Sequence, residues 1–408
     1  MRTLDVDQLA TVVGAIPGTP RVVASGNFAT PVTALAALDA EWEAYRLFAL
    51  NAQGGVPSRA GVTLETCFVG PGMRHAPTLR YVPSRLSMAP LLFGRALPPD
   101  VVLVHTSTPR EGTVSLGTEV NVLPAALDAV KSRGGLVVAQ VNPRMPYTFG
   151  DGVVPCDDVD YAVEVDEPLA SPPALAQDDT AREIGARVAA LVPDGATLQL
   201  GIGAVPDATL QGLTGRQGLR LWSEMFSDGV LALDETGALD PDTPLTASFL
   251  FGSPALYAWV DRNPRVRVLR TERTNAPALI AQQPAMTSVN TALQVDLFGQ
   301  ANASRIAGRI YSGFGGQTDF TTGALHSAGG QALMTLRSWH PKADRSTIVP
   351  LVDEPVTSFQ HSAVVTEQGT AHIFGQDERA QARALVEEAA HPDVRDELEE
   401  EAHALGLF

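Results

Sequence analysis

Apolar runs alternate with segments of helical periodicity through the first part of this 408-residue chain. Runs rich in Val and Leu are typical of strands buried on both faces. The first of these runs begins at Arg21, and four more cover 62–69, 101–105, 136–141 and 161–165. Segments with helical spacing lie between them, at 6–13, from Pro31 to about Leu50, and at 122–131. This alternation predicts an α/β domain with a doubly wound, mostly parallel sheet.

The Pro-rich segment 167–174 has no periodicity and is predicted to be a linker. After it the pattern restarts with a helix at 180–191, a strand at 196–200, a glycine loop, a helix at 207–213 and a strand at 219–222. Further strands are expected at 246–251, 266–269, 346–352 and 363–365, and closing helices at 379–386 and 394–405. The chain is therefore predicted to hold two tandem α/β domains, residues 1–170 and 178–408.

Composition narrows the classes of function. The net charge of −17, from 29 basic and 46 acidic residues, argues against a nucleic-acid or membrane-surface role. The two cysteines lack CxxC spacing, which excludes a Cys-rich zinc site and fits a reducing cytoplasm. The eight histidines are scattered, so no metal is expected. Neither a signal peptide nor a transmembrane helix is expected.

Glu224 lies where the predicted strand 219–222 ends, before a helix that begins near Val230. In α/β proteins, ligands and catalytic residues gather at this edge of the sheet. A carboxylate between Trp222 and Met225 is in partly apolar surroundings and could act as a nucleophile or a base. On these residues alone, a solvated loop glutamate is the simpler interpretation.

Two glycine-rich segments could present backbone N–H groups to a ligand. The Gly201-Ile-Gly203 loop precedes a helix, but Pro206 replaces the third glycine of a dinucleotide fingerprint. The segment 310–320 is predicted to be a loop, and the alternative for it is a tight structural turn. The sequence has no Walker P-loop, H-E-x-x-H or G-x-S-x-G motif. Backbone amides beside a carboxylate nucleophile would suit acyl transfer.

Several stretches together resemble the acetyl-CoA hydrolase/transferase family of class I CoA-transferases, and within it the 4-hydroxybutyrate CoA-transferase-like group. The stretches are Gln199-Leu-Gly-Ile-Gly-Ala-Val-Pro-Asp-Ala208, Ser223-Glu-Met-Phe-Ser-Asp-Gly229, Tyr311-Ser-Gly-Phe-Gly-Gly-Gln-Thr-Asp-Phe320, Val365-Thr-Glu-Gln-Gly369, Ala390-His-Pro-Asp-Val-Arg395, and the segments 139–151 and 289–300. The resemblance runs from about residue 20 to the end in the family's order. It implies two tandem CoA-transferase-like α/β domains of the NagB/RpiA type.

The resemblance also implies roles for individual residues. Glu224 would be the nucleophile, and Asn275 would orient it or the acyl group. The backbone N–H groups of Val205 and of Gly316 (or Gly315) would form the oxyanion hole. The residues implied in binding CoA or substrate are Gly201, Gly203, Gly313, Gly315 and Gln317. Coenzyme A would be a substrate, no metal would be needed, and a cytoplasmic homodimer is expected.

The implied reaction moves CoA between an acyl-CoA and a small carboxylic acid of the acetate, butyrate or 4-hydroxybutyrate class. It would be a ping-pong reaction through a covalent glutamyl-CoA intermediate. Alternatives are an acetyl-CoA hydrolase on the same scaffold and a non-catalytic CoA-binding protein. The chain departs from the family pattern at Phe359-Gln-His361, at Gln368 and at Thr108-Pro-Arg-Glu-Gly112. The identities of the two acids between which CoA would move therefore stay open.

Overall fold

The computed structural model describes residues 1–172, 178–357 and 360–408. The chain forms two compact units, and each consists of two segments. The first unit is Met1–Pro172 with Pro244–Thr274, and the second is Pro173–Thr243 with Asn275–Phe408. The first division falls close to the predicted boundary between domains. The segment 244–274, expected in the second domain, belongs instead to the first unit. Of the predicted linker, residues 173 and 174 lie outside the described residues.

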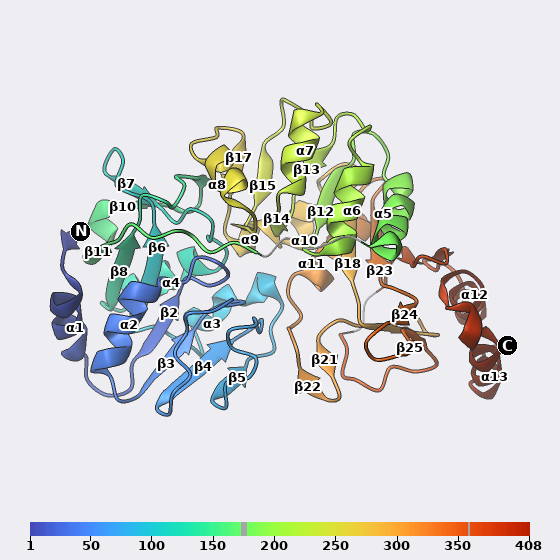
Figure 1. Ribbon diagram of the computed structural model, residues 1–408, viewed down its shortest axis with the longest axis horizontal. Helices are drawn as coiled ribbons and strands as arrows, with labels where there is room; N and C mark the ends of the chain where they lie inside the picture. The colour runs from blue at the N-terminus through green and yellow to red at the C-terminus, as the bar shows by residue number, and fades with distance from the viewer. Residues whose placement is uncertain (173–177, 358–359) are drawn as a thin grey trace. The chain divides into compact units, whose positions relative to one another are not determined.

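An eight-stranded sheet forms the centre of the first unit, and all its neighbouring strands are parallel (Figure 1). In order across the sheet they are β1 (Arg2–Thr3), β11 (Tyr161–Glu164), β8 (Leu136–Val141), β6 (Val101–Thr106), β2 (Arg21–Ala24), β3 (Tyr45–Phe48), β4 (Val62–Thr66) and β5 (Leu79–Tyr81). The residues of β2 and β6 are all buried, as strands covered on both faces must be.

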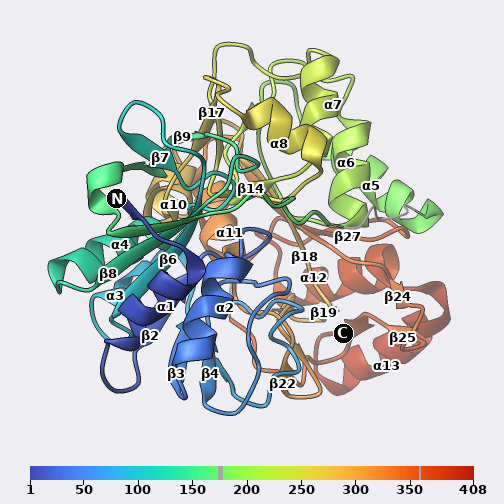
Figure 2. The same ribbon diagram turned by 60° about the vertical axis from the view of Figure 1, so that its left-hand side comes forward.

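Helices cover both faces of this sheet (Figure 2). The main ones are α1 (Val6–Gly14), α2 (Val32–Glu41), α3 (Pro90–Phe93) and α4 (Leu123–Ser132). Because β2 leads through α2 toward one edge and β6 leads through α4 toward the other, right-handed crossovers place these two helices on opposite faces. The remaining elements of the unit are β7 (Thr113–Ser115), β9 (Phe149–Gly150), β10 (Val153–Pro155), β15 (Leu245–Ala247), β16 (Phe249–Leu250), β17 (Val266–Val268), α8 (Pro254–Val260) and α9 (Thr271–Thr274).

The second unit has a six-stranded sheet in which only the last strand is antiparallel to its neighbour. In order they are β13 (Arg220–Leu221), β12 (Thr197–Leu200), β18 (Thr287–Thr291), β23 (Gln331–Thr335), β27 (Ala363–Val365) and β28 (Thr370–His372). The chain passes from β12 to β13 on one side, and later places β18 on the other side of β12. Such a reversal of strand order marks the place where ligands bind in open α/β sheets.

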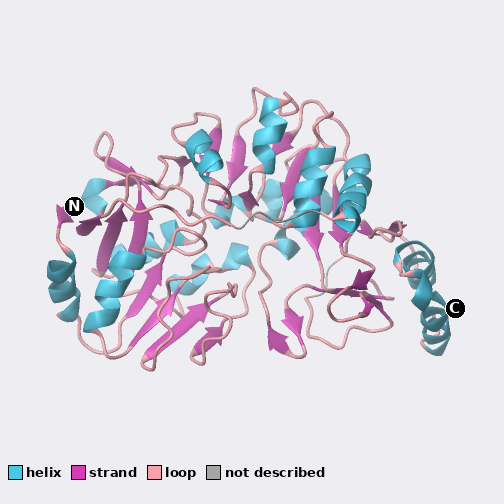
Figure 3. Cartoon of the chain, viewed as in Figure 1, coloured by secondary structure: helices cyan, strands magenta, loops and turns pink. Residues whose placement is uncertain are grey.

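Helices also cover both faces of the second sheet. The helices α5 (Asp179–Leu191), α6 (Ala204–Gly212) and α7 (Gly229–Glu235) lie in front of it in Figures 1 and 3, and α10 (Pro277–Ile280) and α11 (Gln317–His326) lie behind it. The closing helices are α12 (Glu378–Ala384), which continues into a π-helical turn at Leu385–Ala389, and α13 (Arg395–Ala404).

Short strands and hairpins complete the second unit. They are β14 (Met225–Phe226), β19 (Gln294–Asp296), β20 (Ala301–Asn302), β21 (Arg305–Ile306), β22 (Arg309–Ile310), β24 (Trp339–His340), β25 (Arg345–Ser346) and β26 (Ile348–Val349). The strands β20, β19 and β26 form a three-stranded sheet. No helix in the described ranges is both long and apolar enough to cross a membrane.

The predicted fold class is confirmed, with three corrections in detail. The helix expected from Pro31 to about Leu50 ends at Glu41, and residues 45–48 form the strand β3. The central strands β18 and β23 were not predicted. The segment from Gln317 onward, expected to be a loop, is the helix α11.

Candidate active site

The backbone before Glu224 is held against the carboxyl end of β12. The N–H of Trp222 donates to the carbonyl of Leu198 at 3.1 Å. The Ser223 hydroxyl donates to the carbonyl of Leu200 at 3.3 Å. Glu224 follows directly, half-buried, three residues after β13 ends. This is the strand-end position that the sequence predicted, at the carboxyl edge of the second sheet.

Two groups from distant segments hold the Glu224 carboxylate. The side-chain amide of Asn275 donates from Nδ2 to Glu224 Oε2 at 2.9 Å. The backbone N–H of Gly316 also donates to this carboxylate. Gly316 caps the N-terminus of α11, so the carboxylate faces the end of a helix dipole that favours negative charge. The structure thus brings three of the predicted site residues into contact.

The surroundings of Glu224 raise its pKa to about 7. Loss of hydration is the largest cause, because it disfavours the charged carboxylate. The negative charge of Asp319 raises this pKa further, while the hydrogen bonds from Asn275 and Gly316 lower it. A carboxyl group with a pKa near neutrality that remains bound by two donors has the properties of a catalytic acid, base or nucleophile.

Position 316 has no room for a side chain. A Cβ atom there would lie 1.9 Å from Glu224 Oε2 and 2.3 Å from Asn275 Nδ2. Both distances are far below van der Waals contact, so a side chain here would displace the carboxylate and the amide from the positions that they now hold. The preceding Gly315 has a φ of +55°, a conformation that side chains rarely adopt. This loop is therefore shaped by close approach to Glu224.

The loop after β12 leads into α6 at the same edge of the sheet. Gly203 has a φ of +125° and precedes the first turn of the helix, which contains Val205. The N–H groups of a first helical turn have no acceptor within their own helix. A Cβ atom at Gly201 would enter open space, so this backbone is accessible to a ligand. Val205 is on the correct edge, but its role as an oxyanion donor stays a prediction.

The remaining predicted residues lie at the start of α11. Gly313 and Gly315 are buried in the loop before it. Gln317 is the first helical residue, and its side chain donates to the sulfur of Met334 at 3.4 Å, which fixes it against β23. Asp319, which is 1% exposed, raises the pKa of Glu224, but the sequence alone indicated no role for it. Asp319 lies three residues after Gly316. This spacing indicates a role for Asp319 only once α11 is known to begin at Gln317.

Comparison with known proteins identifies the family. Residues 60–171 match the model of the acetyl-CoA hydrolase/transferase N-terminal domain, and residues 252–402 match that of the C-terminal domain. The chain is 39% identical over 332 residues to 4-hydroxybutyrate coenzyme A transferase of Clostridium kluyveri, an alignment that covers 78% of this chain and 76% of that protein. The chain belongs to the acetyl-CoA hydrolase/transferase family.

The chain is also similar to other known proteins. The chain is 35% identical to succinyl-CoA:acetate/propanoyl-CoA:succinate CoA transferase of Fasciola hepatica, with 88% of this chain and 78% of that protein aligned. The crystal structure of 4-hydroxybutyrate CoA-transferase from Porphyromonas gingivalis matches with a TM-score of 0.83 at 33% identity, covering 99% of this chain and 98% of that one. RipA from Yersinia pestis matches with a TM-score of 0.93 at 26% identity, covering 100% and 98%.

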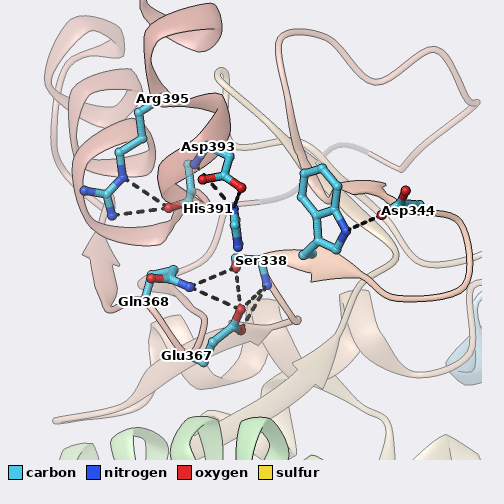
Figure 4. A network of polar contacts seen from close by, with 9 residues as sticks. Ser338, Asp344, Glu367, Gln368, His391, Asp393 and Arg395 are labelled. Atoms are coloured by element: carbon cyan, nitrogen blue, oxygen red, sulfur yellow. Dashed lines mark hydrogen bonds and ion pairs between the residues drawn. The ribbon is translucent and has the colours of Figure 1, made fainter.

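A polar network lies at the ends of β23 and β27, on the same edge of the sheet as Glu224 (Figure 4). The Glu367 carboxylate accepts hydrogen bonds from the backbone N–H of Ser338 at 3.0 Å and from the Ser338 hydroxyl. Gln368, one of the departures from the family pattern, donates to the Ser338 hydroxyl at 3.3 Å. Gln368 therefore belongs to the network as a polar member.

The other two departures from the acetyl-CoA hydrolase/transferase pattern have different surroundings. His361 is buried, and loss of hydration lowers its pKa to about 4, so it is neutral at physiological pH. Phe359 lies outside the described residues. Residues 108–112 are exposed and form a tight turn, in which Glu111 has a φ of +49°. In the described part of the chain, no cluster of His, Cys, Asp and Glu has the arrangement of a metal site.

Proposed function

We propose that this protein moves CoA between an acyl-CoA and a small carboxylic acid, with Glu224 as a covalent nucleophile. The observation that carries the proposal is the carboxylate of Glu224 held by Asn275 Nδ2 and the Gly316 N–H, with a pKa of about 7. At neutral pH a substantial fraction of such a group is ionised, and an ionised carboxylate that has lost much of its hydration is a stronger nucleophile than one in water.

The first half of the reaction transfers the acyl group and then CoA to Glu224. A carboxylate oxygen of Glu224 attacks the thioester carbonyl carbon, the C–S bond breaks, and CoA leaves as a thiolate. The product is an acyl-glutamyl anhydride. The thiolate then attacks the glutamyl carbonyl carbon, the anhydride C–O bond breaks, and the first acid leaves as a carboxylate. CoA is now bound to Glu224 as a thioester.

The hydrogen bonds seen in the structure suit the second attack. When the thiolate adds to the glutamyl carbonyl, negative charge develops on a glutamyl oxygen. The Gly316 N–H and Asn275 Nδ2 already point at that carboxyl group, so they can stabilise the charge without reorganisation. Oxyanion stabilisation of the substrate carbonyl in the first attack is proposed for the Val205 N–H, at the start of α6. The acceptor acid then reverses both steps and leaves with CoA.

The similarity to named CoA-transferases supports small carboxylic acids as the substrate class. The relatives act, by their names, on 4-hydroxybutyrate, succinate, acetate and propanoate. We propose the same class for this protein, with coenzyme A as a substrate and no metal in the mechanism. Homodimeric assembly and a cytoplasmic location stay predictions.

Hydrolysis of an acyl-CoA is the second candidate. Acetyl-CoA hydrolase of Candida albicans is 31% identical over 213 residues, half of this chain and 40% of that protein. The two reactions share the attack by Glu224 and differ in whether water or a carboxylate accepts the glutamyl group. Measuring CoA release from acetyl-CoA with and without added acetate, butyrate or 4-hydroxybutyrate distinguishes them. Equal release without any acid would establish hydrolysis and overturn the transferase proposal.

The test of the covalent step is mass spectrometry after borohydride reduction. A glutamyl thioester is reduced to an alcohol, a loss of about 14 mass units from the original acid. The protein is mixed with an acyl-CoA, reduced and digested. A loss on the peptide that contains Glu224 supports the proposal. If CoA is transferred but no peptide changes mass across a panel of acyl-CoAs, the covalent carboxylate mechanism is wrong. Binding of CoA without any turnover would favour a non-catalytic CoA-binding protein.

A further inference from the structure

The nucleophile loop, residues 223–229, lies against helix α6 within the second unit. This loop carries Glu224 and leads into α7, and α6 and α7 pack side by side (Figure 1). The first turn of α6 contains Val205, whose N–H is proposed to stabilise the substrate oxyanion. The contact between the loop and α6 therefore joins the two parts of the site that act in the first attack.

Helix α6 is held on its other side by α5. A Cβ atom at Gly185 of α5 would lie 2.7 Å from the Cβ of Ala208, and one at Gly212 of α6 would lie 2.9 Å from the Cβ of Ala189. No side chain fits at either glycine without displacing its neighbour, so the two helices approach each other closely. Close packing of this kind leaves little freedom for a helix to shift. Helix α6 is therefore a fixed surface against which the loop can be placed.

Two contacts join the nucleophile loop to α6. The hydroxyl of Ser227 donates to Oδ1 of Asp207 at 3.4 Å. Two residues further on, Gly229 lies so close to Leu210 that a Cβ atom at position 229 would be 2.4 Å from Leu210 Cδ1. Both contacts come from the part of the loop that follows Glu224, so they act on the backbone that leads away from the nucleophile.

The packing between the loop and α6 is otherwise incomplete. A cavity of about 10 Å³ lies between the carboxyl end of β12, the loop, α6 and α7, with room for about one water molecule. Apolar side chains provide most of its surface, among them Leu200, Met225 and Val230. Atoms that face an unfilled cavity lack the contacts that would hold them in place. The position of the loop on α6 therefore depends strongly on the contacts at Ser227 and Gly229.

The carboxylate of Asp207 is well suited to accept the hydrogen bond from the loop. Asp207 is half-buried, and burial raises its pKa above the ordinary value, while the hydrogen bond from Ser227 lowers it. This bond therefore favours the ionised form, and a hydrogen bond to an ionised acceptor is roughly twice as strong as one between neutral groups. Asp207 also lies in the first turn of α6, where the helix dipole favours a negative charge.

We infer that Ser227 and Asp207 are positioning residues, which hold Glu224 at a fixed distance from the N–H of Val205. Ser227 lies three residues after Glu224, and Asp207 lies two residues after Val205, so one hydrogen bond connects the two segments. This inference rests on the proposed function, because it concerns the attack of Glu224 on the thioester. In that attack the carboxylate meets the carbonyl carbon while the carbonyl oxygen receives the Val205 N–H, so both groups must be placed together.

The first test is a double-mutant cycle in the full chain. Ser227→Ala and Asp207→Ala each remove one side of the hydrogen bond, and the combined variant removes both. We expect each single variant to lower kcat about tenfold with the KM for an acyl-CoA unchanged, because a geometry needed in the transition state is lost. The combined variant should lose no more than a single one, because the two residues act as a unit. A combined loss equal to the product of the single losses would overturn the inference.

Conservative variants distinguish positioning from general stability. Ser227→Thr keeps the hydroxyl and Asp207→Asn keeps an acceptor oxygen, so both should recover most of the kcat lost in the alanine variants. Thr236→Ala is the matched control, because it removes a hydroxyl that donates to the carbonyl of Ala232 at 2.8 Å, at the far end of α7. Thermal unfolding shows that each variant is folded. A loss of kcat in Thr236→Ala as large as in Ser227→Ala, or no recovery in either conservative variant, would show that the inference is wrong.

A second measurement does not depend on catalysis. Amide hydrogen exchange, followed by mass spectrometry, reports the local opening of the peptide that contains residues 223–229. We expect exchange in this peptide to become faster in Ser227→Ala and in Asp207→Ala and to stay unchanged in Thr236→Ala. Unchanged exchange in both alanine variants would show that the hydrogen bond does not hold the loop. Faster exchange with an unchanged kcat would show that the loop is held but that this does not position Glu224. Either result would overturn the inference.

These measurements separate the inference from the proposed function. If the wild-type protein turns over no thioester but the loop exchanges faster in both alanine variants, the link between the loop and α6 is supported and the proposed function is overturned. If CoA is transferred and Glu224 is trapped by borohydride, but neither alanine variant lowers kcat, the proposed function is supported and the inference is wrong.

Discussion

Asn275 Nδ2 lies 2.9 Å from Glu224 Oε2, although 51 residues separate the two in sequence. The amide can donate to the carboxylate but not remove its proton, so this contact favours the ionised form of Glu224. Burial has the opposite effect and is larger, which leaves the pKa of Glu224 at about 7. The site therefore combines a desolvated carboxylate with donors that keep it oriented.

Glu224→Ala should abolish turnover and leave the fold intact. The substitution removes the atom that would form the covalent bond, and a half-buried carboxylate at a strand end contributes little packing. We expect kcat to fall by at least about 10³-fold, as for the loss of other nucleophiles. Steady-state rates with an acyl-CoA and acetate measure this, and circular dichroism controls for folding. A variant that retained a tenth of the activity would show that Glu224 is not the nucleophile.

Asn275→Ala should shift the pH dependence of activity to higher pH. The hydrogen bond from Asn275 lowers the pKa of Glu224, so its loss raises that pKa and less of the carboxylate is ionised at neutral pH. We expect the acidic limb of kcat/KM, near pH 7 in the wild type, to move up by about one pH unit. The profile of kcat/KM from pH 5 to 9 measures the shift. Loss of activity by the same factor at every pH would contradict it.

Asp319→Asn should shift the same limb in the opposite direction. The negative charge of Asp319 raises the pKa of Glu224, and asparagine has nearly the same shape without the charge. The limb should therefore move to lower pH. Thermal unfolding of the variant is the necessary control, because Asp319 is buried in the first turn of α11. An unchanged limb in a folded variant would show that Asp319 does not act on the nucleophile.

The sequence predicted the position of Glu224 but not its partners. A buried apolar run followed by turn residues defines a strand end locally, so the strand before Glu224 and the loop after it could be predicted. Asn275 and Gly316 reach the carboxylate from segments whose distance in space no local pattern encodes. Their roles came from the resemblance to a family, and the structure supplies the contacts.

The errors in the fold prediction have physical causes. Gly323 lowers helix propensity within α11, and the segment therefore looked like a loop. A Cβ atom at Gly323 would lie 2.5 Å from Ile280, so glycine is present to let α10 and α11 approach closely. In the first unit, the Ala- and Leu-rich run continues toward Tyr45–Phe48 without a Gly or Pro to mark the end of the helix. Three of those four residues are buried in the sheet. This tertiary burial favours a strand, and the local sequence pattern does not encode it.

Gly316→Ala should disable the site without unfolding the protein. The new methyl group would have to displace the carboxylate of Glu224 and the amide of Asn275, which it would approach within 1.9 Å and 2.3 Å. A displacement of about 1 Å at a reacting group can lower the rate about 100-fold. Gly215→Ala is the matched control, because a Cβ atom there meets nothing within 4 Å. Equal activity of the two variants would mean that the Gly316 loop does not position Glu224.

Glu224→Gln should stabilise the protein more at neutral than at acidic pH. An unfolded glutamate loses its proton near pH 4.5, whereas in the folded protein Glu224 keeps it until about pH 7. Between these values the unfolded state binds fewer protons, so the free energy of unfolding of the wild type falls as pH rises. Glutamine does not ionise and avoids this loss. The difference in Tm between variant and wild type should therefore be small at pH 4.5, increase up to about pH 7 and stay constant above it. Glu235→Gln, at an exposed glutamate of α7, serves as the control. A difference in Tm that is the same at every pH would show that Glu224 is ionised in the folded protein as readily as in the unfolded chain.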